Sequence, residues 1–395
     1  MPTRFEPGAP APERHIPLSV PLIGGNAWRY VKQCLDEGWV SSAGSFVTEF
    51  EQQVAARAGK AHGVACSTGT AALHLGLLVA GVEPDDEVIV PALTFAAPAN
   101  AVRYVNAWPR FIDIEADHWQ LDPQRVREFI ERGCDWRQRQ LIDRTTGRRV
   151  RAILPVDLLG HPCDIDALMA IARDFDLVVV EDATESLGAR YRDTPVGARA
   201  DVSCFSFNGN KVITAGGGGV LATDRAEWAA RARHLSTQAK SDPIEYVHDE
   251  IGFNYRLTNL QAALGVAQLE QLDDYVGRKR ALAAAYTTAL AAVPGLATMT
   301  EAQWARSMFW LYTVRVDARG YGMDSRALLR RLDEHRIQAR PLWQPLHRSP
   351  AHRGSPPADA PVADRVASAA LSLPSSVGLT EDDQRRVIEV VAGRS

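Results

Sequence analysis

Short hydrophobic runs alternate with helix-length stretches between about residue 61 and residue 223. Helices are predicted from Thr70, over about 96–106, and from Asp164 to about Phe175. Buried strands separated by helices are typical of a mostly parallel sheet covered on both faces, with its active site at the carboxyl ends of the strands. The runs predict strands at 62–66, 87–91, 110–114, 151–156, 177–181, 202–207 and 220–223.

The pattern changes beyond about Asn259. It becomes mainly helical, with a strand-like segment at 309–316 and a further helix from Ser325, which indicates a smaller C-terminal domain. The first residues are rich in proline and have no periodic pattern, which is typical of an extended arm. We therefore expect an N-terminal arm (1–15), a large domain (16–255) and a small C-terminal domain (256–395).

Composition and charge narrow the class of protein. The chain has 395 residues, 46% hydrophobic and 23% charged, and a formal net charge of −4, which argues against wholesale nucleic-acid binding. No hydrophobic run is long enough to cross a membrane and the first residues lack a signal-peptide core, so we expect a cytoplasmic protein. The five cysteines include no C-x-x-C pair, which predicts free thiols and no metal site.

Two polar motifs follow predicted strands. Ser67-Thr68-Gly69-Thr70 begins a helix, where free amides and the helix dipole bind phosphate, although a plain helix cap accounts for the same residues. Glu181-Asp182-Ala183-Thr184-Glu185 follows a very apolar run, so that its acidic residues lie at the end of the predicted strand. A carboxylate held there can pair with the protonated ring nitrogen of a pyridine-type cofactor, or it can simply cap a helix.

A lysine follows a third strand. Lys211 ends the segment Phe205-Ser206-Phe207-Asn208-Gly209-Asn210-Lys211, and four glycines at 216–219 allow the backbone to approach a ligand closely. Such a lysine can form a Schiff base with an aldehyde, whereas an isolated lysine is usually a solvated surface charge. The glycines precede a strand, so they do not form a dinucleotide-binding motif.

These three motifs, in this order, resemble the DegT/DnrJ/EryC1/StrS family of sugar aminotransferases. The resemblance extends from about Ile16 onward and implies an α/β fold of the aspartate aminotransferase type, which is fold type I of the pyridoxal 5'-phosphate (PLP) enzymes. Further matching segments are GWVSSAG (38–44), PALTFAAPANAV (91–102), GFNYRLTNLQAALG (252–265), RPLWQPLH (340–347) and LSLPSSVGLT (371–380).

The resemblance implies a role for each matching residue at the cofactor. Lys211 would bind PLP covalently and later transfer protons, and Asp182 would pair with the pyridine nitrogen. The remaining implied contacts are the Gly69 and Thr70 amides and the Ser206 hydroxyl on the phosphate, Phe95 stacked on the ring, and Glu185 at the phenolic oxygen, where many relatives have Gln.

Other matches imply a partner subunit and a substrate pocket. Asn254 matches an asparagine that reaches the cofactor phosphate of a second copy, which implies a homodimer with shared active sites. Arg340, Trp343 and His347 match a segment near the nucleotide-sugar pocket, although a buried Trp often serves only packing.

Two segments stand apart from the family pattern. Asp157 and His161 lie in VDLLGHP, where relatives often have His at the first of these two positions, so a small change in sugar contact is expected there. The stretch 136–151 holds six arginines, which would suit a nucleic-acid patch, but in a net acidic chain a solvated hairpin-like insertion with a Thr-Thr-Gly turn is favoured.

The resemblance also implies a reaction. The best-matching subgroup transfers an amino group from L-glutamate to C4 of UDP-2-acetamido-4-keto-6-deoxyhexoses, for surface glycans or nonulosonic acids. Similar residues occur in GDP-perosamine synthases, which act on GDP-4-keto-6-deoxymannose, so the nucleotide stays open. A sugar dehydratase of this family would have His in place of Lys211, and a noncatalytic PLP-fold regulator would be expected to lack Lys211 or Asp182.

Overall fold

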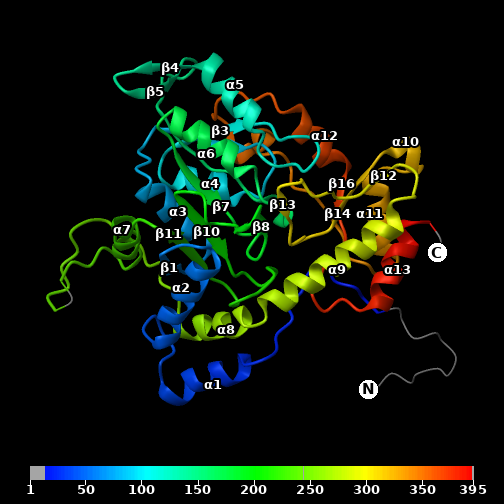
Figure 1. Cartoon of the computed structure of the whole chain (residues 1–395), viewed down its shortest axis with the longest axis horizontal. Helices are drawn as coiled ribbons and strands as arrows, with labels where there is room; N and C mark the ends of the chain where they lie inside the picture. Colours follow the sequence, from blue (N-terminus) through cyan, green and yellow to red (C-terminus); the bar gives the residue numbers. More distant parts are fainter. Residues whose placement is uncertain (1–13, 243, 394–395) are drawn as a thin grey trace, which may run out of the picture.

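A seven-stranded sheet forms the centre of the computed structural model, which describes residues 14–242 and 244–393 (Figure 1). β11 runs antiparallel to both of its neighbours, and the other pairs are parallel. The predicted α/β fold is confirmed, with strand ends within three residues of those expected. In order, the strands are β1 (His62–Cys66), β11 (Gly219–Thr223), β10 (Val202–Ser206), β7 (Val178–Asp182), β6 (Val150–Ile153), β2 (Glu87–Pro91) and β3 (Trp108–Ile112).

Helices cover both faces of this sheet. Along β7, Val178 and Val180 belong to one hydrophobic core and Val179 to another, because successive side chains of a strand point to opposite faces. The first core includes α2 (Ser45–Arg57), α3 (Gly69–Val79), α4 (Ala97–Tyr104) and α7 (Ala226–Ser236), and the second includes α5 (Pro123–Gly133) and α6 (Ile165–Asp174).

The C-terminal third contains long helices and a four-stranded sheet. α8 (Asn259–Leu269) packs against α1 (Ala27–Glu37) and α2, and α9 (Leu272–Leu290) leads away from the large sheet (Figure 1). The predicted boundary at 255/256 stays a prediction, and the predicted arm at 1–15 lies almost wholly outside the described residues. The other elements of this third include β12 (Leu296–Ala297), β13 (Ala305–Arg306), β14 (Thr313–Val316), β16 (Ala370–Ser372), β15 (Arg340–Pro341), α10 (Ala318–Tyr321), α11 (Ser325–Glu334), α12 (Pro361–Ala369) and α13 (Glu381–Val391).

The strand predicted at 309–316 is wrong in its first half. Only β14 is strand, because the backbone before it bonds to the loop that follows β6. The Met308 amide donates to the carbonyl of Gly160 at 3.0 Å and the Trp310 amide to the carbonyl of Leu159 at 2.9 Å. This connection brings Trp310 next to the large sheet.

The arginine-rich insertion forms a hairpin. β4 (Cys134–Arg137) and β5 (Gln140–Asp143) pair through a turn at Gln138 and Arg139, both with positive φ, and the predicted Thr-Thr-Gly turn follows as a second turn. All five cysteines are free and buried. Among the described residues, no helix combines the length and the hydrophobicity needed to span a bilayer.

Candidate active site

A cavity of about 290 Å³ lies where β1, β7 and β10 end. Three loops meet there, one after each strand, together with the glycines that precede the antiparallel β11. This edge of the sheet is where α/β folds bind ligands. The lining residues are Thr68, Gly69, Thr70, Leu73, Phe95, Ala97, Thr184, Glu185, Ser206, Asn208, Asn210, Lys211, Gly217, Gly218, Trp310 and Trp343.

The start of α3 forms one wall of the cavity. Thr68 caps the helix, its hydroxyl accepting a hydrogen bond from the Ala71 amide at 3.0 Å. Gly69 and Thr70 are the first helical residues, whose amides have no partner within the helix and can bind an anion. A Cβ at Gly69 would lie 2.8 Å from the Ser206 Cβ, so only glycine allows this close approach.

Lys211 projects into the cavity from the loop after β10. Its side chain is 13% exposed, and Nζ lies 3.6 Å from Glu185 Oε1. On another side, Nζ lies 4.1 Å from the centroid of the Trp310 ring, a cation–π contact. The Trp310 indole donates to the carbonyl of Asn210 at 2.8 Å, which fixes the ring beside the lysine. Lys211 is therefore not a solvated surface charge.

Asp182 lies behind the cavity lining, at the last position of β7. It is buried, and its Oδ1 accepts a hydrogen bond from the Thr184 amide at 3.1 Å. Burial raises the pKa of Asp182, while the Thr184 hydrogen bonds and the charge of Lys211 act in the opposite direction. A buried carboxyl group of this kind can hold a cationic ligand atom more strongly than an exposed one.

Glu185 is a second buried acid at the site. Its Oε2 accepts a hydrogen bond from the Leu159 amide at 2.8 Å, and Leu159 adopts a positive φ of 59° in the turn after β6. Burial raises the pKa of Glu185 to about 7, and the nearby Lys211 opposes this shift. Glu185 is thus close to its titration point at neutral pH.

The structure brings together most of the predicted cofactor residues but only Trp343 of the three predicted substrate residues. Asn254 and Arg340 are exposed and His347 lies 3.5 Å from Asp364, and none of the three lines the cavity. Trp310, which sequence reasoning missed, does line it. The predicted residues that line the cavity are Gly69, Thr70, Phe95, Glu185, Ser206, Lys211 and Trp343.

The raised pKa of Glu185 predicts a pH-dependent stability. Its folded value of about 7 exceeds the usual 4.5, so its favourable contribution is complete at acidic pH and is lost as the pH rises through 7. Between about pH 5 and about pH 8, the free energy of unfolding of the cofactor-free parent should fall by about 3 kcal/mol more than that of Glu185→Gln. Urea unfolding at both pH values measures this, and an equal loss in the variant and the parent would contradict it.

Known proteins are similar to this chain in sequence over nearly its whole length. The sequence model described as "DegT/DnrJ/EryC1/StrS aminotransferase family" matches residues 21–392. A GDP-perosamine synthase from Caulobacter vibrioides is 38% identical over 374 residues, which cover 94% of this chain and 96% of that protein. EpsN of Bacillus subtilis, whose name assigns it to the pyridoxal phosphate-dependent aminotransferases, is 36% identical over 386 residues, with 96% and 95% covered.

A solved structure is similar to this chain in both fold and sequence. DesV from S. venezuelae, determined in complex with a ketimine intermediate, matches with a TM-score of 0.83 at 34% sequence identity. The match covers 93% of this chain and 94% of DesV. The similarity therefore extends over the large sheet, the cavity and the C-terminal third.

Proposed function

Because the chain belongs to the DegT/DnrJ/EryC1/StrS aminotransferase family, we propose that it transfers an amino group from L-glutamate to C4 of GDP-4-keto-6-deoxymannose. The chain is a PLP-dependent nucleotide-sugar aminotransferase. The single observation that favours the GDP-linked sugar is its 38% identity to a GDP-perosamine synthase over nearly the whole chain. This similarity moves the proposal from the UDP-linked sugar, which the sequence motifs favoured, to the GDP-linked alternative.

The residues of the cavity fit PLP. Gly69 leaves room beside Ser206, so that two helix-start amides and a hydroxyl are available to a phosphate. A buried carboxyl group, Asp182, is available to a protonated ring nitrogen, and Lys211 offers an amine to an aldehyde. We assign Phe95, which lies edge-on to Trp343 at 6.0 Å, to the face of the cofactor ring.

The chain's own residues supply proton transfer and charge. PLP, when bound, withdraws electron density from the substrate carbon that loses a proton. Asp182 as a carboxylate stabilises positive charge on the ring nitrogen, and its burial strengthens that interaction. Lys211 accepts the proton at its Nζ and later returns it, and it must be neutral when it accepts the proton. Glu185 and Trp310 hold the amine within the cavity when Lys211 is not bonded to the cofactor.

The proposal includes a homodimer with shared sites. Asn254 is exposed and lies outside the cavity of its own chain, as expected for a residue that serves a partner's cofactor phosphate. Large apolar side chains are exposed on α1 and before Asn254, including Trp28 (74%) and Ile251 (87%), and a second copy would cover such a surface. The mass of the protein in solution tests this, and a monomer would contradict it.

The substrate side of the proposal concerns the mouth of the cavity. Trp343 lines it, whereas Arg340 in β15 is exposed and His347 is not among the lining residues. We assign these three residues to the nucleotide-sugar pocket, with Trp343 nearest the sugar.

The proposed activity is tested with PLP-loaded protein, L-glutamate, and either the GDP-linked or the UDP-linked 4-keto-6-deoxy sugar. Product mass reports amination, and we expect kcat/KM for the GDP-linked sugar to be at least about tenfold higher. A preference for the UDP-linked sugar would favour the UDP-2-acetamido-4-keto-6-deoxyhexose as the substrate instead. Amination of neither sugar would contradict the proposed substrate class.

A further inference from the structure

Asp157 is a buried acid at the position where the sequence departs from its relatives. It lies four residues after the end of β6 and has no exposed surface. Its Oδ1 accepts a hydrogen bond from the Cys163 amide at 2.9 Å, and its Oδ2 accepts one from the Ser186 hydroxyl at 2.7 Å. Asp157 therefore does not contact the cavity, and the change in sugar contact expected from the sequence has no basis at this residue.

Both hydrogen bonds of Asp157 hold segments that contact or adjoin Glu185. The bond to Cys163 closes the turn that contains Leu159, whose amide donates to Glu185 Oε2. The bond to Ser186 holds the residue next to Glu185 in the chain. One buried carboxyl group thus fixes Glu185 from two directions.

Glu181 is a second buried acid beside this group, and burial and then the charge of Glu181 raise the pKa of Asp157. Ser203 Oγ lies 2.7 Å from Glu181 Oε2 and 2.9 Å from the carbonyl of Gly197. The single proton of the Ser203 hydroxyl can satisfy only one of these oxygens, so both contacts are hydrogen bonds when Glu181 carries a proton.

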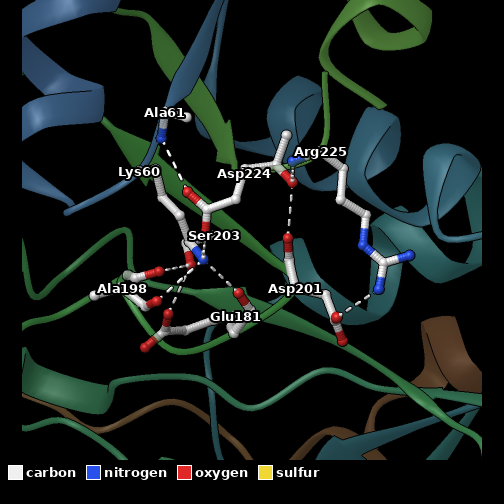
Figure 2. Close-up of polar contacts among 11 residues, drawn as sticks. Lys60, Ala61, Glu181, Ala198, Asp201, Ser203, Asp224 and Arg225 are labelled. Carbon is white, nitrogen blue, oxygen red and sulfur yellow. Dashed lines mark hydrogen bonds and ion pairs between the residues drawn. The ribbon is translucent and has the colours of Figure 1, made fainter. Parts of the chain in front are cut away.

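Lys60 does not neutralise this pair by direct contact. Figure 2 shows it near Glu181 and Ser203, but its Nζ donates to the carbonyls of Ala198 and Ala200 and to Asp224 Oδ2, at 2.8 to 3.1 Å. These three acceptors use all three ammonium protons. A proton on Glu181 therefore limits the negative charge around Asp157.

We propose that Asp157 is a positioning residue that holds Glu185 for the cofactor. The proposal rests on the cofactor contact assigned to Glu185 above. It predicts that PLP affinity depends on Asp157 only through Glu185.

The pair also has a pH dependence. Burial raises the pKa of Asp157 and raises that of Glu181 to about 7. The other titratable groups that face the pair are Lys60 and Asp182, which act on Glu181, and the thiols of Cys163 and Cys204. Because these folded pKa values exceed the usual ones, the favourable contribution of the protonated Glu181 is complete at acidic pH and is lost as the pH rises through about 7.

A double-mutant cycle tests the proposal. PLP is titrated into cofactor-free parent protein, Asp157→Ala, Glu185→Ala and the double variant, and binding is followed by protein fluorescence. We expect Asp157→Ala to weaken PLP binding about tenfold, or about 1.4 kcal/mol, in the parent. In the Glu185→Ala background we expect less than about a twofold effect, since the two residues act as one unit.

Two further variants separate positioning from general destabilisation. Asp157→Asn can keep the bond from Cys163, while Ser186 turns its proton to the Ala183 carbonyl at 3.3 Å. We expect Asp157→Asn to bind PLP nearly as tightly as the parent protein. Asp143→Asn is the control for general destabilisation. It alters another buried aspartate, which lies in the β4–β5 hairpin and pairs with Arg110 of β3, and it should lower stability without affecting PLP binding.

Each outcome decides a separate claim. Unchanged PLP binding by Glu185→Ala would overturn the proposed Glu185 contact, and with it this inference. Weaker binding by Glu185→Ala, together with an equal loss from Asp157→Ala in both backgrounds, would overturn the inference alone. A loss of PLP binding by Asp143→Asn as large as that by Asp157→Ala would also overturn it, because destabilisation would then explain both.

Discussion

Lys211→Ala is expected to lower turnover by about 10⁴-fold or more, because among the described residues no other lysine lines the cavity to accept and return the proton. The chain has five lysines, all in the part that the structure describes, and Lys211 alone among them lines the cavity. The variant should still bind the aminated form of the cofactor, since the helix-start amides, Ser206 and Asp182 are unchanged. Steady-state amination and equilibrium binding of that form measure the two effects.

Two controls sharpen this prediction. Lys32→Ala removes an exposed lysine that pairs with Asp36 on α1 and should leave turnover unchanged. A mixture of Lys211→Ala and Asn254→Ala copies should regain activity, because a mixed dimer has one site with both residues intact. Normal multiple turnover by Lys211→Ala would contradict the assigned role, and no recovery in mixed dimers would contradict shared sites.

Asp182→Asn is expected to lower turnover by roughly 10³-fold, because a neutral amide cannot stabilise positive charge on the ring nitrogen. The side chain has nearly the same shape and can still accept from the Thr184 amide, so the fold should be retained. Steady-state kinetics measure the loss of turnover, and thermal unfolding reports whether the variant is folded.

Asp201→Asn is the matched control for Asp182→Asn. Asp201 precedes β10, at the opposite end of the sheet, where it accepts from the Val179 amide and pairs with Arg225 (Figure 2). Its replacement should reduce stability and leave turnover intact. Similar losses of turnover in both variants would mean that the charge of Asp182 has no special role.

The large sheet was predictable because its strands are encoded locally. The run before Glu181 is uniformly apolar because both faces of β7 are buried, and this signal needs no knowledge of other segments. The residues that end such strands, including Asp182 and Lys211, could be assigned to one edge of the sheet for the same reason.

The remaining parts depend on contacts between distant residues. Trp310 reaches the cavity because its amide bonds to Leu159, and a hydrophobic pattern at 309–316 cannot distinguish that connection from a strand. The role of Asp157 depends on hydrogen bonds to Cys163 and Ser186, which join separate loops. The roles of Asn254, Arg340 and His347 stay predictions, since they require a second copy or a substrate.

The central claim is that Lys211 is the residue that bonds PLP. Borohydride treatment of the PLP-loaded protein fixes the cofactor to the lysine that holds it, and peptide mass spectrometry then locates the modification. We expect the modification on Lys211, with none on the buried Lys60 or Lys279 or on the other two lysines. Specific modification of any other lysine, or none after full loading with PLP, would contradict the assignment of this cavity as the active site.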